Sequence, residues 1–284
     1  MSTALAFPTP DGPMSQVPSL DVLDRISEET ELGDGVRVAG ELIPITARHD
    51  GLLTTALTDA IHARYFRRTT GTFHTDCRRP GRRGRDFCQR LADTLQPYLF
   101  RRDAWRFSYR TTDGVPSFVV AAGNAVDGEA ATCFLHLQPG TAPDLFARVV
   151  TTLDGYGLDF RAELAGDPDA CRRADAAVLT VRREDVPAVA RVALRLGERA
   201  PFALAPSVPA FTRQIAAGVA LADHPGHHTS FGRHRSRLIA VGLVAAGHGA
   251  GRAHRRAAVL ASLTRAGLDP AALHLNPGNP DFRV

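Results

Sequence analysis

Histidine and arginine side chains crowd one short stretch of the chain, directly before a run that turns apolar. The segment 224–243, HPGHHTSFGRHRSRLIAVGL, contains four histidines and three arginines. Ser230 is a suitable N-cap, and the spacing that follows predicts a helix over 231–246. On a helical wheel, His234 and Arg235 share the apolar face of this helix, in its first turns.

A guanidinium on an apolar helix face is costly to bury unless an anion pairs with it. A helix N-terminus also favours anions, because its free N–H groups and dipole are positive. Arg235 and His234 therefore predict a pocket for phosphate or carboxylate, with Arg233 on the opposite face. The alternative is structural: Arg235 pairs with Asp175 or Asp223, and His234 is an ordinary core histidine.

The same stretch could in principle bind a metal, because four imidazoles are enough ligands for zinc. The histidines lie in a Pro/Gly turn without a known ligand spacing, and no cysteine is near them. We therefore expect no metal at this cluster, which comprises His224, His227, His228 and His234.

A second candidate group lies on two expected strands. The segment 158–164 alternates apolar and polar residues, so that Arg161 and Glu163 share its polar face. On the segment 131–137, His136 also belongs to a single strand face. If the two strands are neighbours, His136, Arg161 and Glu163 could converge; the alternative is an exposed, salt-bridged sheet face.

A loop dense in arginine and glycine follows the first long helical pattern, over 67–85. Such a loop could bind a peptide or a phosphate group, or be a solvated surface loop. Phe73 is the only aromatic residue in it, so the interleaved aromatics of a nucleic-acid surface are missing. The peptide-binding candidates are Arg78, Arg79, Arg82 and Arg83.

All 34 basic residues of the 284 are arginine, and the net charge is only +4. Arginine stays protonated in proteins, so a base in this chain must be His, Asp, Glu, Tyr or Cys. No apolar run is long enough to span a membrane, and we expect neither membrane nor nucleic-acid partners. Four cysteines are few for this length and indicate reduced thiols in a cytoplasmic protein.

The elements that must position these side chains suggest an α+β fold: a mixed or antiparallel sheet flanked by helices, with a largely helical C-terminal third. Residues 1–20 are expected to be a flexible tail. Residues 21–284 are expected to form a single domain, helical over about 21–105 and α+β over about 106–284.

Hydrophobic periodicity supplies the expected elements. A turn-forming segment, GNAVDGE, separates the first two strands. Besides the helix over 231–246, the predicted helices cover 52–66, 86–99, 141–157 and 184–198, and the predicted strands cover 116–122, 131–137, 158–164 and 176–181.

The segment 173–275, with the motifs PAFT, GVALAD and SFGRHR at their spacing, resembles the HopA-type family, named for a bacterial type III effector. Relatives of that family lie in biosynthetic clusters for class V lanthipeptides and thioamide-containing peptides. There they resemble lyases that follow a kinase and eliminate phosphate from Ser or Thr of a precursor peptide, giving dehydroalanine or dehydrobutyrine.

The resemblance implies a metal-free, cofactor-free phosphoserine/phosphothreonine lyase with two partners, a precursor peptide and a separate kinase. It places Arg213, His234 and Arg235 near the site, with His136 as an imidazole partner. Arg161 and Arg233 add to the phosphate-binding set. β-Elimination fits these residues, since a departing phosphate needs fixed positive charge and a proton donor.

One departure from the family pattern concerns lysine. Family members usually carry lysine near Glu163 and at Arg213. Glu163 could replace that base if burial raised its pKa, and a histidine could also serve. The other possibility is a catalytically degenerate lyase that acts as a scaffold for a peptide or a kinase.

Overall fold

The structure, a computed structural model, describes residues 19–284 except for 34, 44–49, 69–81, 100–105, 113–114, 124–128 and 227–228.

Seven of the described strands form one sheet in which every pair is antiparallel, in the order β4-β5-β7-β8-β6-β10-β9. Neighbours in this sheet are often far apart in the sequence, so the site depends on long-range pairing. The strands are β4 (Arg106–Thr112), β5 (Val115–Ala122), β6 (Ala130–Leu135), β7 (Phe160–Ala165), β8 (Ala177–Arg182), β9 (Arg213–Ala216) and β10 (Val219–Asp223).

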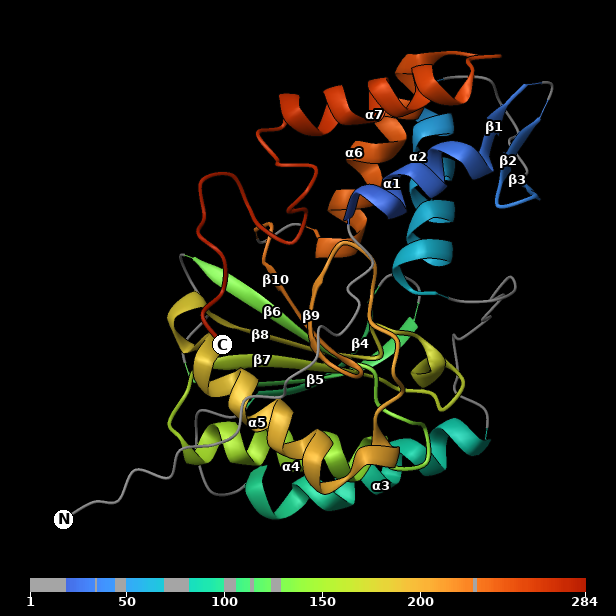
Figure 1. Cartoon of the computed structure of the whole chain (residues 1–284). Helices are drawn as coiled ribbons and strands as arrows, with labels where there is room; N and C mark the ends of the chain where they lie inside the picture. Colours follow the sequence, from blue (N-terminus) through green and yellow to red (C-terminus); the bar gives the residue numbers. More distant parts are fainter. Residues whose placement is uncertain are drawn as a thin grey trace.

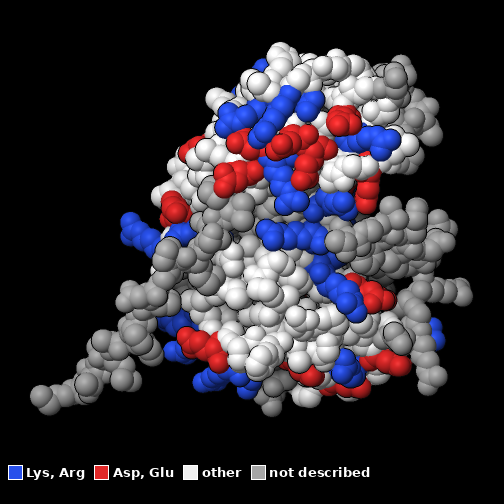
Figure 2. Space-filling view, turned by 45° about the vertical axis from the view of Figure 1, so that its right-hand side comes forward, with Lys and Arg blue, Asp and Glu red and all other residues white. Residues whose placement is uncertain are grey.

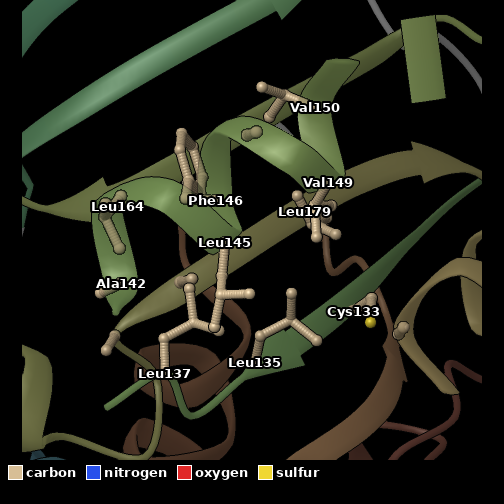
Figure 3. Packing of buried hydrophobic residues seen from close by; sticks show 14 of the residues in the cluster. Cys133, Leu135, Leu137, Ala142, Leu145, Phe146, Val149, Val150, Leu164 and Leu179 are labelled. Carbon is tan, nitrogen blue, oxygen red and sulfur yellow. The ribbon is translucent and has the colours of Figure 1, made fainter. Parts of the chain in front are cut away.

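One face of this sheet is covered by three helices, α3 (Arg82–Leu99), α4 (Ala142–Gly155) and α5 (Val186–Arg199) (Figure 1). Alternate residues of the strands point to this side and are buried against the helices. Figure 3 shows the apolar side chains of α4 packed against those of the strands, which include Leu135, Leu164 and Leu179.

A second apolar core joins the opposite face of the sheet, near β6 and β10, to a helical layer. Phe134 of β6 and Ala222 of β10 belong to this core. The layer contains α1 (Ser19–Glu29), α2 (Asp50–Ile61), α6 (Phe231–Ala246) and α7 (Arg252–Arg265), which Figure 1 shows above the sheet. Gly242 allows α6 to approach α7 closely, since a Cβ there would lie 2.5 Å from the Cα of Val259.

The predicted α+β class with a helical C-terminal portion is confirmed, and the sheet is antiparallel. The five predicted helices and four predicted strands all form; the helix over 231–246 has the expected ends, and the other helices have shifted ends. Strand β7 alternates as expected: Phe160 and Ala162 are buried, whereas Arg161 and Glu163 are partly exposed. Within the described residues, no helix has the length and apolarity that a membrane crossing requires.

The structure also contains elements that the sequence analysis does not predict. The region expected to be helical over 21–105 also contains a three-stranded sheet of described residues, β1 (Thr30–Leu32), β2 (Val36–Val38) and β3 (Glu41–Ile43). Each of these strands is too short to show a period. Helix α3 begins at Arg82, four residues earlier than its apolar pattern. Ser19 and Leu20 already belong to α1, and the rest of the expected tail lies outside the described residues.

The turn GNAVDGE does not make a hairpin of the strands on either side of it. Strand β5 pairs with β4 and β7, and β6 pairs with β8 and β10. The C-terminal third, expected to be helix and loop, also supplies β9 and β10 to this sheet.

Candidate functional site

Helix α6 begins as the sequence predicts. The Ser230 hydroxyl accepts a hydrogen bond from the backbone N–H of Arg233 at 3.4 Å, and the helix ends at Ala246. Gly232 lies so close to Phe66 that a Cβ there would be 2.3 Å from a ring carbon. The helical wheel also places Phe231, Leu238, Val241 and Gly242 on the apolar face with Arg235, but Val241 is 37% exposed.

Arg235 is fully buried, as its position on the wheel indicates. Its guanidinium donates to the carbonyl oxygens of Leu273 (2.8 Å) and Leu275 (2.9 Å), and to the side-chain oxygen of Asn276 (3.0 Å). A further N–H lies 2.6 Å from Nδ1 of His234. Burial lowers the pKa of Arg235 to about 10. The space expected for an anion beside Arg235 therefore holds the chain's own C-terminal segment.

Two more arginines hold the same C-terminal segment. Arg213 donates to the carbonyl oxygen of Phe282 at 2.6 Å and pairs with Asp281 at 2.8 Å. Arg183 donates to Asp223 at 2.8 Å and packs over the ring of Phe282. Asp223, considered above as a partner of Arg235, thus accepts from Arg183.

The polar residues of the two central strands do not converge. Strand β8 lies between β6 and β7, so His136 is not beside Arg161 and Glu163. Arg161 donates to Glu163 on its own strand, at 2.9 Å from Nε to Oε1. His136 is buried at the end of β6, with Nδ1 3.0 Å from the Ser207 carbonyl oxygen and Nε2 3.2 Å from that of Arg172.

The remaining candidates are only partly described. Arg82 and Arg83 form the start of α3, but their side chains, like the whole of Arg78 and Arg79, lie outside the described residues. His227 and His228 lie outside them as well. Among the described residues, no three His, Cys, Asp or Glu side chains form a group that could hold a metal ion.

A different group of polar residues lies between the helical layer and the sheet, following a single π-helical turn, η1 (His62–Phe66), that continues α2. π-Helical turns are rare and frequently occur at functional sites. Just beyond it, Arg68 has φ of 53°, in the left-handed region that costs energy for any residue with a Cβ. Two local departures from regular backbone thus adjoin each other here.

His62 begins this π-helical turn and is only 2% exposed. Within the described part of the chain, its Nε2 atom has no hydrogen-bond partner. A buried polar atom without a hydrogen-bond partner lowers the stability of a protein by about 1–3 kcal/mol. Such atoms are therefore uncommon, and some occur at catalytic sites.

An ion cluster adjoins His62 at the segment before β8. Arg173 holds the carboxylate of Asp175 through two hydrogen bonds, of 2.9 Å and 2.7 Å, and Arg67 lies 3.4 Å from it. Burial alone would raise the pKa of Asp175, but these two guanidiniums hold it well below its usual range. A hydrogen bond from the Ala174 N–H to the Arg67 carbonyl oxygen, at 3.0 Å, ties the two segments together.

Burial also lowers the pKa of His62 well below its ordinary value, and the charges of Arg67, Arg173 and Arg233 lower it further. Asp175 acts in the opposite direction but does not outweigh them. Three guanidiniums from three elements therefore act on one uncharged imidazole. Figure 2 shows arginine side chains across the middle of the molecule, between its helical part and its sheet.

We call this group, His62, Arg67, Arg173, Asp175 and Arg233, the seam cluster. Of its members, Arg233 is the one that the family resemblance predicts to bind phosphate. It comes from the first turn of α6 and pairs with Asp59 of α2 at 2.6 Å. His62 was not predicted from the sequence, because it lies beside an apolar stripe that is typical of an ordinary amphipathic helix. The available signal was a histidine directly followed by the arginine-rich segment.

Comparison with known proteins agrees with the motif resemblance. The family model described as the HopA1 effector protein family matches residues 108–275. No curated protein matches this chain.

Two solved structures share the fold. The effector protein from Pseudomonas syringae pv. tomato strain DC3000 is 16% identical, with a TM-score of 0.56 over 80% of this chain and 96% of that one. The effector protein from Pseudomonas syringae pv. syringae strain 61 is 12% identical, with a TM-score of 0.53 over 82% and 100%. The family match covers more than half of the sequence, so this chain belongs to the HopA1 effector protein family.

Proposed function

We propose that this protein eliminates phosphate from phosphoserine or phosphothreonine of a precursor peptide, and that the seam cluster is where it does so. The observation that carries the proposal is that Arg67 and Arg173 hold Asp175, and Arg233 holds Asp59, close enough for their charges to act on the buried imidazole of His62. A phosphate monoester carries a charge of about −1.5 to −2 at neutral pH. Guanidinium forks match its oxygens in geometry as well as in charge.

The reaction breaks a Cα–H bond and the bond from Cβ to the phosphate oxygen, and forms a Cα=Cβ double bond. Negative charge moves onto the departing phosphate, so prearranged guanidiniums stabilise the transition state. His136 is retained as a candidate proton donor, since its Nε2 lies against the Arg172 carbonyl oxygen, next to Arg173. The sequence-derived candidates Arg161, for phosphate, and Glu163, as base, lie on β7 and pair with each other.

The proposed partners follow from this chemistry. A separate kinase must supply the phosphorylated residue, and the peptide acted on is a ribosomally made precursor in the cytoplasm. Arg82 and Arg83, at the start of α3, with Arg78 and Arg79 before them, are the proposed contacts for its leader. No cofactor or metal is part of the proposal.

The test is incubation with synthetic phosphothreonine and phosphoserine peptides, followed by mass spectrometry for loss of phosphoric acid. Arg233→Met should weaken phosphopeptide binding and slow elimination. Arg237→Met is the matched control, because Arg237 is exposed on the same helix. Equal effects of the two variants, or intact peptide after incubation with the wild-type chain, would count against the proposal.

A second function is favoured by one specific observation. The residues that the family resemblance places at the site, Arg213 and Arg235, hold the C-terminal segment, and the chain has no lysine. A degenerate lyase that scaffolds the peptide or the kinase would have this arrangement. Capture of the kinase or the leader peptide that survives His234→Ala and Arg233→Ala, without any turnover, would identify the scaffold.

A further inference from the structure

The chemistry proposed above needs a base, and lysine is absent from the chain. A base must offer a lone pair on a neutral or anionic atom that is not already engaged. In the tautomer that carries its proton on Nδ1, Nε2 of His62 is such an atom, buried and without a partner among the described residues. The structural role of a core histidine would be to make hydrogen bonds, and at Nε2 this one makes none.

Aromatic packing fixes the plane of this imidazole. The His62 ring stacks on Phe66 with centroids 5.2 Å apart and an interplanar angle of 17°. Phe66 in turn meets Phe134 of β6 edge-on, at 5.7 Å. The absence of a side chain at Gly232 makes room for the Phe66 ring beside α6. The imidazole is therefore held between the helical layer and the sheet.

The surroundings also keep the imidazole in its basic, uncharged form. The charged groups that act on it are Arg67 after η1, Arg173 and Asp175 before β8, and Arg233 of α6. Burial and the three guanidiniums disfavour a proton on the free enzyme, whereas Asp175 favours one. A proton taken up during the reaction would consequently be stabilised by Asp175 and by the phosphate dianion alongside.

We propose that His62 is the general base that removes the Cα proton of the phosphorylated residue in the seam cluster. The inference rests on the proposed function and names its missing base. The Cα–H electron pair becomes the Cα=Cβ bond, the bond from Cβ to oxygen breaks, and its electrons leave with phosphate. The proton moves to Nε2. Because His62 is 2% exposed, the hydrogen bond from the Ala174 N–H to the Arg67 carbonyl oxygen must open before the phosphorylated residue can reach Nε2.

Three other candidate bases of the described chain are paired or protonated. Glu163 accepts from Arg161 on the face of β7. Nδ1 of His234 lies 2.6 Å from the guanidinium of Arg235. Burial raises the pKa of the Cys88 thiol to about 11, so its thiolate is scarce at neutral pH.

The experiment compares His62→Gln with His254→Gln, an exposed histidine of α7. Each variant is mixed in excess with a phosphothreonine peptide that the wild-type chain converts. Single-turnover elimination is followed by mass spectrometry, and peptide affinity is measured separately by calorimetry. His62→Gln should lower the elimination rate by about 100-fold or more, the range for a lost general base, while affinity and the His254→Gln rate stay at wild-type values.

The outcomes separate this inference from the function on which it rests. Wild-type elimination that persists in His62→Gln overturns the role of His62 and leaves the lyase standing. Wild-type chain that converts no phosphopeptide overturns the lyase, and the base with it. If His62→Gln does not fold, wild-type protein with ¹⁵N-labelled histidine is titrated with a non-eliminable phosphonate peptide. A changed His62 Nε2 resonance supports contact with the ligand, and an unchanged one overturns it.

Discussion

Replacing Arg235 by methionine should destabilise the fold without removing a phosphate ligand. The side chain is fully buried, and its hydrogen bonds reach the carbonyl oxygens of Leu273 and Leu275 and the side chain of Asn276. Each buried acceptor left unpaired costs about 1–3 kcal/mol. Removal of a buried charge offsets part of this cost, so we expect a net loss of about 3 kcal/mol.

Chemical denaturation of Arg235→Met and of the exposed control Arg237→Met measures this loss. A shift of about 2–4 °C in Tm per kcal/mol is usual for chains approaching this size, so a Tm about 6–12 °C lower should accompany it. The control should stay within about 0.5 kcal/mol of wild type. An Arg235→Met protein with wild-type stability but no affinity for phosphopeptide would refute this reasoning and make Arg235 a phosphate ligand.

Three further outcomes are expected. Gly242→Ala should lower the free energy of unfolding by about 2 kcal/mol or more, because its Cβ would lie 2.5 Å from the α7 backbone. Gly155→Ala is the control, because its Cβ would meet open space. Equal stabilities of the two variants would contradict the close packing of α6 on α7. Gly232→Ala should slow elimination by displacing Phe66; an unchanged rate argues against aromatic positioning of His62. Burial lowers the pKa of His62, and that of His234 to about 4. Because these histidines take up protons more readily in the unfolded chain, the free energy of unfolding should fall as the pH is lowered from about 6.5 to 4. Denaturation midpoints that do not change over this pH range would contradict the prediction.

Local patterns were enough to predict much of the fold. The N-cap at Ser230 and the alternation of β7 follow from spacing alone, and both are present. The expected buried face of α6 is only partly correct, because Arg235 is buried but Val241 is exposed. Strand order does not follow from spacing. Placing His136 next to Arg161 required β6 and β7 to be neighbours, and the insertion of β8 between them depends on long-range pairing.

The candidate site was predicted less well, for a similar reason. The helical wheel correctly predicts that Arg235 is buried. It does not predict whether the guanidinium binds a phosphate or backbone carbonyl oxygens, because both are acceptors for its N–H groups. Its partners come from the C-terminal segment about 40 residues later, a contact that no local rule supplies. His62 was missed because a π-helical turn has no sequence signature and its surrounding charges are assembled by the tertiary fold.

The central claim is that guanidiniums and an imidazole at the seam cluster expel phosphate from a peptide. Its most direct test is inorganic phosphate released from a phosphothreonine peptide by wild-type chain and by His62→Gln at equal concentration. The account predicts stoichiometric phosphate and a dehydrobutyrine product with the wild-type chain, and almost none with the variant. Equal release from both proteins would contradict the assigned base, and no release from either would contradict the elimination itself.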